Sequence, residues 1–365
     1  MFTAISAACA IETQAPQAYL VDFDTGVVLF EKNAEQKMAP SSMTKIMTAH
    51  LVFKRLKSGD IKLGDMLFVS ENAWKMGGSK TFVQINSKVS VEDLLTGVIV
   101  QSGNDASIVL AEGLAGTEAA FAEEMTREAH KDGATNTTFF NATGWPAEGH
   151  ESTAKDLELM AERTIRDFPE EYAKYYSLKD FTYNNIKQGN RNTLLYKDMG
   201  ADGMKTGHTD AGGYGIVATA KQGDRRLILV VNGLPSSKAR DQEATALLNW
   251  GFSHFKNYKI FGKGDVVEVA DVWGGEGNSV ELISSEDIIL TLPRDQRKDL
   301  SVKVAYDSPL AAPIKSGDPL GTLEVTIPGK GVRNVPLHAA RDVGQASFFQ
   351  RINNSIRYLL WGKHE

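Results

Sequence analysis

The spacing of apolar residues divides the chain into two parts. Up to about residue 256, short strand-like runs alternate with stretches of helical period, whereas strand-like alternation dominates from residue 266 to 335. The pattern predicts a mixed α and β domain over residues 11–256 and an all-β domain over residues 257–343. Two terminal segments, residues 1–10 and 344–365, fit neither domain.

The first domain begins with a predicted hairpin. Apolar runs at 18–21 and 27–30 flank Asp24-Thr25-Gly26, a triplet typical of turns. The same triplet occurs in aspartic proteases, but that chemistry needs a second carboxylate that shares a proton with the first. No second Asp-Thr-Gly occurs in the sequence, so we interpret Asp24 as a turn residue.

Helical periodicity follows in three stretches. Residues 42–56 carry apolar side chains at helical spacing after the start signal Pro40-Ser41, so Ser42 is expected to open a helix. The stretches 91–100 and 105–114 meet at a tight connection, Ser102-Gly103-Asn104. Residues 141–146 are expected to form a surface loop.

The last part of this domain has the pattern of a small sheet. Residues 215–220 and 226–231 predict a hairpin, and residues 204–209 predict a preceding strand at a sheet edge beside the Ser42 helix. A helix over residues 240–255 is expected to close the unit.

The terminal segments indicate export and surface attachment. Residues 1–10 are small and apolar and end Ala8-Cys9-Ala10, which is typical of the remnant of a secretory signal. Residues 345–361 place aromatic and aliphatic side chains within one arc of a helix and arginines opposite. Such a helix could dock on the β domain, but its aromatic face and flanking basic residues favour a helix lying in a membrane interface. No apolar run reaches the about 20 residues needed to span a bilayer.

Composition and charge exclude several function classes. The 365 residues carry a net charge of −6 and no dense Lys/Arg stripe, which argues against a nucleic-acid partner. Cys9 is the only cysteine, so no intrachain disulfide and no Cys-ligated metal is possible, and the seven histidines show no metal-binding spacing. We therefore expect no metal and no cofactor.

Three short motifs suggest acyl-transfer chemistry because they occur together and in order. They are Ser42-Met43-Thr44-Lys45, Ser102-Gly103-Asn104 and Lys205-Thr206-Gly207. A serine followed three residues later by lysine also occurs at Ser152/Lys155 and Ser253/Lys256, so one such match alone carries little weight.

The chemistry of each residue type suggests a role for it. Ser42 and Lys45 share a helix face, so a lysine with a lowered pKa could take the serine proton. Lys205 is the candidate second cation that keeps Lys45 neutral. Ser102 could relay the proton to the leaving amine, and Asn104 could position the substrate amide. Backbone N–H groups of Ser42 and His208 would form an oxyanion hole; for His208 we expect only the amide to matter.

The three motifs resemble those of the low-molecular-weight penicillin-binding proteins that act as D-alanyl-D-alanine carboxypeptidases. The resemblance covers about residue 13 to the C-terminus. It implies a serine β-lactamase/transpeptidase-like fold with an antiparallel sheet flanked by helices, a small β-sandwich domain and a C-terminal amphipathic anchor helix. It also implies a substrate, the peptidoglycan pentapeptide ending in D-Ala-D-Ala, and acylation of Ser42 by β-lactams. The residues expected near the substrate carboxylate are Lys205, Thr206, Thr209 and Arg240. The implied location is periplasmic, peripherally attached to the outer face of the cytoplasmic membrane.

Other functions use similar motifs and stay open at this point. The class A β-lactamases carry a Glu-x-x-Leu-Asn motif that does not occur between Asn104 and Lys205, which disfavours a β-lactamase. A transpeptidase or endopeptidase uses the same dyad, and the β domain with its terminal helix favours the carboxypeptidase. A peptidoglycan-binding scaffold with a dead site is disfavoured because the motif side chains are chemically intact.

Overall fold

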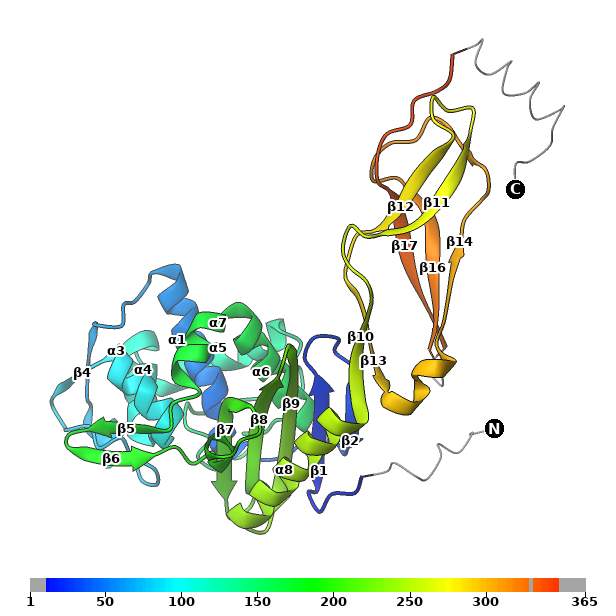
Figure 1. The fold of residues 1–365 in the computed structure, drawn as a ribbon. Helices are drawn as coiled ribbons and strands as arrows, with labels where there is room; N and C mark the ends of the chain where they lie inside the picture. Colours follow the sequence, from blue (N-terminus) through cyan, green and yellow to red (C-terminus); the bar gives the residue numbers. More distant parts are fainter. Residues whose placement is uncertain (1–10, 328–330, 348–365) are drawn as a thin grey trace. The chain divides into compact units, whose positions relative to one another are not determined.

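The computed structural model describes residues 11–327 and 331–347 and divides the chain into two compact units, Met1–Ser253 and His254–Glu365 (Figure 1). The sequence placed this boundary between residues 256 and 257. Each unit has its own hydrophobic core.

The first unit contains a five-stranded antiparallel sheet in the order β2-β1-β9-β8-β7. The predicted hairpins are present at the expected places, with the Asp24 triplet in the turn of the first. The predicted strand over residues 204–209 forms one edge of the sheet. The bounds are β1 Gln17–Asp22, β2 Val28–Lys32, β7 Ala201–Thr209, β8 Gly213–Gln222 and β9 Arg225–Leu234.

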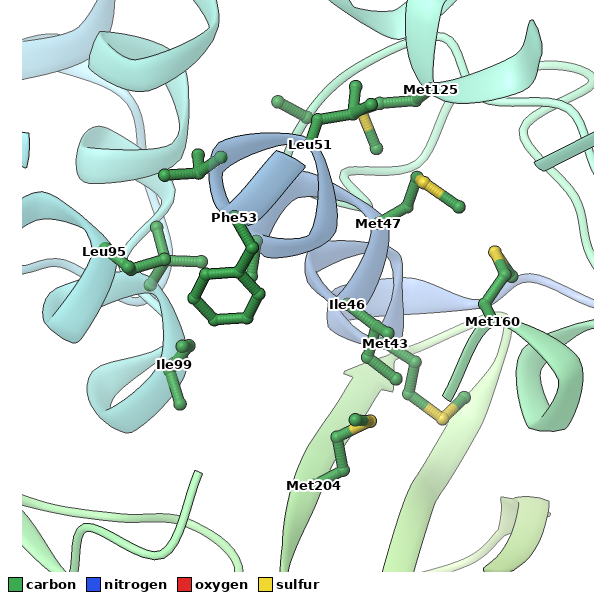
Figure 2. Packing of buried hydrophobic residues seen from close by; sticks show 14 of the residues in the cluster. Met43, Ile46, Met47, Leu51, Phe53, Leu95, Ile99, Met125, Met160 and Met204 are labelled. Carbon is green, nitrogen blue, oxygen red and sulfur yellow. The ribbon is translucent and has the colours of Figure 1, made fainter. Parts of the chain in front are cut away.

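Helix α1 (Lys45–Ser58) crosses the middle of this core. Figure 2 shows Met43, just before the helix, and Ile46 near Met204 of β7, and Phe53 near Leu95 and Ile99 on a neighbouring helical segment. All of these side chains are buried. Residues 45–53 of α1 are all buried, and close packing in a core holds such a segment in place, so the N-terminal end of the helix is fixed. The remaining helices are α2 Glu71–Lys75, α3 Val91–Thr96, α4 Asn104–Ala115, α5 Glu118–Lys131, α6 Ala154–Asp167, α7 Pro169–Tyr175 and α8 Ser237–His254.

Two helix ends differ from the prediction in ways that matter for the motifs. Ser42 lies in a 3-10 turn, η1 (Ser41–Thr44), and the α-helix begins only at Lys45. The predicted helix over 91–100 changes after Thr96 into a π-helical turn, η2 (Gly97–Gln101). Ser102 then adopts a left-handed conformation with φ 61°, which ends the turn and starts the corner before α4.

Short hairpins and turns complete the first unit. Strand β3 (Met66–Phe68) pairs with β4 (Lys88–Ser90), and β5 (Asp180–Tyr183) pairs with β6 (Ile186–Gly189). A 3-10 turn, η3 (Thr193–Tyr196), precedes β7.

The second unit is a sheet domain, as the alternating pattern predicted. Its six-stranded sheet has the order β14-β16-β17-β12-β11-β15, and β10 pairs separately with β13. Apolar side chains from both sheets share one core. The bounds are β10 Phe255–Phe261, β11 Val266–Trp273, β12 Ser279–Ser284, β13 Ile288–Pro293, η4 Arg294–Asp299, β14 Ser301–Ala305, β15 Leu310–Ala311, β16 Pro319–Ile327 and β17 Gly331–Ala339.

The terminal predictions lie almost wholly outside the described residues, since these exclude 1–10 and 348–365. The start of the predicted terminal helix is wrong: residues 344–347 are not helical, and Gln345 pairs with Gly275 in a β-bridge. Within the described part of the chain, no helix has the length and apolar character required to cross a membrane.

Candidate active site

The three motifs meet at one hollow of about 810 Å³ in the first unit. Its wall includes residues from each motif and from the start of α8. The predicted residues that line it are Ser42, Ser102, Asn104, Thr206, Gly207, His208, Thr209 and Arg240. The two predicted lysines, Lys45 and Lys205, are 1% and 3% exposed.

Ser42 and Lys45 form a hydrogen-bonded pair at the floor of this hollow. The Lys45 Nζ lies 3.1 Å from the Ser42 Oγ, because η1 and the first turn of α1 place the two side chains on one face. The same Nζ lies 2.7 Å from the Asn104 Oδ1 and 2.5 Å from the Thr143 carbonyl oxygen. Its three polar neighbours therefore come from three separate segments of the chain.

These three neighbours can all be satisfied by a neutral amine. The amide and carbonyl oxygens can only accept, so they take the two N–H groups of a neutral lysine. The lone pair then faces the Ser42 hydroxyl, which can donate. Burial, helped by the Arg191 cation, lowers the pKa of Lys45 from 10.5 to about 7, although Asp105 and Glu118 oppose the shift. Lys45 is therefore placed and tuned to accept the Ser42 proton.

Asn104 is held so that its oxygen faces Lys45. Its Nδ2 donates to the Gly77 carbonyl at 2.8 Å, which fixes the orientation of the amide, and its backbone N–H donates to the Ser79 carbonyl at 2.8 Å. Gly78 has φ +75°, and a Cβ there would lie 2.9 Å from the Asn104 Nδ2. A glycine at this position therefore allows the loop to approach the amide closely.

Ser102 lines the hollow, and its hydroxyl oxygen is buried. Its backbone is left-handed at the corner between the two helical segments, and the residue is only 3% exposed. The Oγ has no hydrogen-bond partner among the described residues. A buried hydroxyl without a hydrogen bond costs about 1–3 kcal/mol. A substrate or a transferring proton that uses the Ser102 hydroxyl would account for this cost.

The edge strand β7 forms the opposite wall. Its Gly207 packs directly against η1, since a Cβ there would lie 3.0 Å from the Pro40 carbonyl oxygen. The Thr209 and Ser41 hydroxyls are 3.0 Å apart and tie the end of β7 to the same turn. As an edge strand, β7 leaves backbone groups free to pair with an extended ligand.

Cationic side chains gather at the other end of the hollow. Arg240 is 5% exposed, and its guanidinium donates to the Asp241 carboxylate from Nε and Nη2 at 3.0 and 2.8 Å and to the Arg191 carbonyl at 3.3 Å. Arg191 and Arg240 both line the hollow. Burial lowers the pKa of Lys205 well below its usual range, and Lys45, Arg191 and Arg240 lower it further.

The charge arrangement corrects one prediction. We expected Lys205 to be the fixed cation that keeps Lys45 neutral. After burial, the cation that lowers the pKa of Lys45 is Arg191, and Lys205 is itself shifted towards the neutral form. Repulsion between the two lysines is mutual, so a proton on one disfavours a proton on the other.

The segment 141–146 also differs from the prediction of a surface loop. Trp145 and Pro146 are exposed, but Ala142, Thr143 and Gly144 are buried. A Cβ on Gly144, which has φ +77°, would lie 1.8 Å from the Ser41 carbonyl oxygen. The loop therefore presses against η1 and delivers the Thr143 carbonyl to Lys45.

Two residues of the site, Thr143 and Arg191, were not predicted from the sequence. Neither belongs to a motif, and Thr143 acts through its backbone. The one available signal was Gly144 within a loop that follows Asn141, because a glycine at a positive φ often marks a close backbone approach.

The two competing Ser/Lys pairs are not dyads. The Ser152 Oγ is fully buried 2.8 Å from the Thr137 Oγ1, while Lys155 pairs with Glu35 on the surface. The Ser253 Oγ donates to the Trp250 carbonyl within α8.

One group among the described residues has potential metal ligands: His50, Glu128 and Asp132. The two Glu128 oxygens are paired with Lys54 and Lys131, and the His50 Nδ1 is 3.0 Å from the Thr164 Oγ1. The carboxylate is already neutralised by cations, so this donor set does not suit a metal ion.

Comparison with known proteins places this geometry in a family. The family model described as D-alanyl-D-alanine carboxypeptidase, peptidase S11, matches residues 3–236, and the model of the penicillin-binding protein 5 C-terminal domain matches residues 255–345. The D-alanyl-D-alanine carboxypeptidase DacC of Escherichia coli is 41% identical over 361 residues, which cover 96% of this chain and 90% of the relative.

Two solved structures of penicillin-binding proteins are similar to this chain. Penicillin-binding protein 5 from Haemophilus influenzae matches with a TM-score of 0.82 and 38% identity over 92% of this chain and 99% of that chain. Penicillin-binding protein D2 from Listeria monocytogenes in its ampicillin-bound form matches with a TM-score of 0.62 and 30% identity over 67% of this chain and 99% of that chain. The chain therefore belongs to the peptidase S11 family of D-alanyl-D-alanine carboxypeptidases and carries the C-terminal domain of penicillin-binding protein 5.

Proposed function

We propose that the protein is a serine-type D-Ala-D-Ala carboxypeptidase that removes the terminal D-alanine from peptidoglycan pentapeptides through an acyl-Ser42 intermediate. One observation carries the proposal: the Lys45 Nζ contacts the Ser42 Oγ while two obligate acceptors occupy its N–H groups. The named activity of the relatives supports the same reaction and substrate.

Acylation begins with transfer of the Ser42 proton to the neutral Lys45. The Ser42 oxygen attacks the carbonyl carbon between the two D-alanines, and the backbone N–H groups of Ser42 and His208 stabilise the oxyanion. Ser102 lines the hollow, and its buried hydroxyl has no hydrogen-bond partner within the described part of the chain; it relays the proton to the leaving amine. The C–N bond breaks and free D-alanine leaves. Water then hydrolyses the ester and restores Ser42.

The cationic end of the hollow holds the terminal carboxylate of the substrate. Lys205, Thr206, Thr209 and Arg240 are the predicted contacts, and Arg191 joins them because it lines the same end. A bound carboxylate raises the pKa of Lys205, so Lys205 becomes charged when substrate arrives. In the complex Lys205 then carries the positive charge that the sequence predicted for it.

β-Lactams acylate the same serine under this proposal. The similarity to the ampicillin-bound penicillin-binding protein D2 supports it, as does the shared fold. A carboxypeptidase retains the penicilloyl group on Ser42 for longer than a β-lactamase, which turns it over with an activated water.

We further propose that the protein works in the periplasm, attached peripherally to the outer face of the cytoplasmic membrane through residues 348–365. The support is the sequence alone: the aromatic face and flanking basic residues of 345–361 suit a membrane interface. Deleting residues 348–365 should release the protein from anionic lipid vesicles in a flotation assay without changing D-Ala release. Unchanged vesicle binding would contradict the anchor.

The activity is tested by measuring D-Ala release from a peptide that ends in D-Ala-D-Ala, together with penicillin hydrolysis by the same preparation. D-Ala release with slow penicillin turnover supports the carboxypeptidase. Rapid penicillin turnover without D-Ala release would show a β-lactamase instead. A penicilloyl adduct with neither activity would favour a binding role.

A further inference from the structure

Next to the turn that carries the nucleophile lies a buried histidine, His150, that has no role in the proposed reaction. It is 6% exposed, and it is not among the described residues that line the hollow. Its Nε2 lies 2.9 Å from the Thr44 Oγ1, and its Nδ1 lies 3.1 Å from the backbone nitrogen of Phe140. The imidazole therefore connects η1, which contains Ser42, to the loop that contains Thr143.

The two contacts determine which nitrogen of the ring carries the proton. The Phe140 N–H can only donate, so the His150 Nδ1 must accept and carries a lone pair. The Nε2 then carries the proton and donates it to the Thr44 hydroxyl oxygen. Burial, followed by the positive charge of Lys45, lowers the pKa of His150 to about 4, so the ring is neutral at the pH of about 7 at which Lys45 titrates. The neutral ring that both contacts need is thus the form present during acylation.

The loop holds the imidazole in place by its own backbone. A β-bridge between Thr138 and Glu151 closes the loop over residues 139–150. His150 is the last residue inside this closure, and its ring packs edge-on against the Phe139 ring with centroids 5.6 Å apart. The ring is therefore fixed by packing, which leaves its two nitrogens for the two segments that it joins.

These two segments supply two of the three polar neighbours of the Lys45 amine. The Ser42 Oγ in η1 lies 3.1 Å from the Nζ, and the Thr143 carbonyl oxygen in the loop lies 2.5 Å from it. Turn and loop also touch beside the imidazole, since a Cβ on Gly144 would lie 2.9 Å from the Thr44 Oγ1. A shift of one segment against the other would turn the Lys45 lone pair away from the hydroxyl, and a displacement of about 1 Å can slow a reaction by about 10²-fold.

Other hydrogen bonds hold the same loop at Ala142. The Thr48 hydroxyl donates to the Ala142 carbonyl at 2.7 Å, and a Glu118 carboxylate oxygen accepts the Ala142 N–H at 3.0 Å. These two bonds tie the loop to α1 and α5, whereas the bond from His150 ties it to η1. Loss of the His150 bond should therefore loosen the turn against the loop without detaching the loop.

We propose that His150 is a positioning residue for the proton transfer from Ser42 to Lys45. Through Thr44 it holds η1 against the loop, and it so fixes the Ser42 hydroxyl and the Thr143 carbonyl around the Lys45 amine. This inference rests on the proposed function, because it concerns the same acylation step. It gives a role in that step to a side chain outside the three motifs.

The first test compares two substitutions of the histidine. His150→Phe keeps a buried aromatic ring but has neither donor nor acceptor, whereas His150→Gln keeps one of each. The rate constant for acylation at saturating benzylpenicillin should fall about tenfold or more in His150→Phe and stay within about threefold of the wild type in His150→Gln. The benzylpenicillin concentration that gives half the maximal rate should stay the same in both variants, because His150 is not among the described residues that line the hollow.

A second buried histidine supplies the matched control. His50 is 2% exposed, and its Nδ1 lies 3.0 Å from the Thr164 Oγ1, but this partner lies on α6 and not on η1. His50→Phe should lower Tm, as His150→Phe does, and should leave the acylation rate of the folded protein unchanged. The control separates the loss of a buried hydrogen bond in general from the loss of this one.

The second test removes the partner of the histidine. Thr44→Val deletes the acceptor hydroxyl with little change of shape, so it should slow acylation about as much as His150→Phe does. The double variant should be hardly slower than either single variant, because both substitutions remove the same hydrogen bond. Thr44→Val carries the test by itself if His150→Phe does not fold.

The outcomes separate this inference from the proposed function. A wild-type acylation rate in folded His150→Phe or in Thr44→Val would overturn the positioning role. So would equal losses in His150→Gln and His150→Phe, losses that multiply in the double variant, or an equal loss in His50→Phe. Absence of acylation in the wild-type protein would overturn the proposed function, and the role of His150 with it.

Discussion

Lys45 should control the pH dependence of acylation. Burial and Arg191 lower the pKa of Lys45 to about 7, and only the neutral amine can accept the Ser42 proton. The second-order rate constant for acylation by benzylpenicillin should therefore rise with pH, with a midpoint near 7. Below the midpoint it should fall about tenfold per pH unit, because each unit leaves one tenth as much neutral Lys45.

The size of this effect follows from the shift. A lysine with its ordinary pKa of 10.5 would be neutral in roughly three of ten thousand molecules at pH 7, whereas one with a pKa of about 7 is neutral in about half. The lowered pKa therefore raises the fraction of molecules with a neutral Lys45 on the order of a thousandfold at pH 7. The shift corresponds to about 5 kcal/mol by which burial disfavours the charged form of Lys45, and the packing of α1 must offset this loss of stability.

Arg191→Gln tests the cause of the shift. It removes the neighbouring cation and leaves Lys45 buried, so the midpoint should move upward by about 0.5 to 1 pH unit. Arg127→Gln, which removes an exposed arginine on α5, should leave the midpoint in place. Stopped-flow acylation between pH 5 and 10 measures the midpoint of each variant. A wild-type midpoint above 9, or a downward movement in Arg191→Gln, would refute the reasoning.

Three further changes test the packing and the proton relay. Gly144→Ala should lower the free energy of unfolding by about 3 kcal/mol or more and reduce acylation, because the added Cβ meets the Ser41 carbonyl. The control Gly26→Ala, at φ +67° in open space, should lower it by only about 1 kcal/mol. Equal losses for the two variants in a denaturant titration would contradict the clash. Burial raises the pKa of Glu158 to about 8, so the folded protein loses stability as pH rises from about 4.5 through 8. Glu158→Gln should therefore be about 2–4 kcal/mol more stable than the wild type at pH 9 and as stable as the wild type at pH 4. A stability difference that does not change with pH would contradict the buried carboxyl as its cause. Ser102→Ala should slow acylation by about 10²-fold without lowering Tm, whereas an unchanged rate would remove Ser102 from the relay.

The sequence predicted the features that depend on local spacing. Ser42 and Lys45 are three residues apart, which places them on one face of a helical turn whether the turn is 3-10 or α. The edge strand carrying Lys205 was predicted from alternation and from the hairpin that follows it. The comparisons confirm the family that these motifs suggested.

The sequence could not predict features that depend on distant segments meeting. Thr143 contributes a backbone carbonyl, which any residue could supply, so its side chain carries no signal. Arg191 follows β6 in the chain and reaches Lys45 only because the fold brings that segment to the hollow. The pKa values of Lys45 and Lys205 depend on burial, and burial is a property of the assembled core.

The central claim is that Ser42 is the nucleophile and Lys45 its base. Its most direct test is the intact mass of the protein after incubation with benzylpenicillin, followed by peptide mapping, for the wild type and for Ser42→Ala. We predict one penicilloyl group on Ser42 in the wild type and none in a folded Ser42→Ala protein. An adduct on another residue, or continued acylation of Ser42→Ala, would contradict the account.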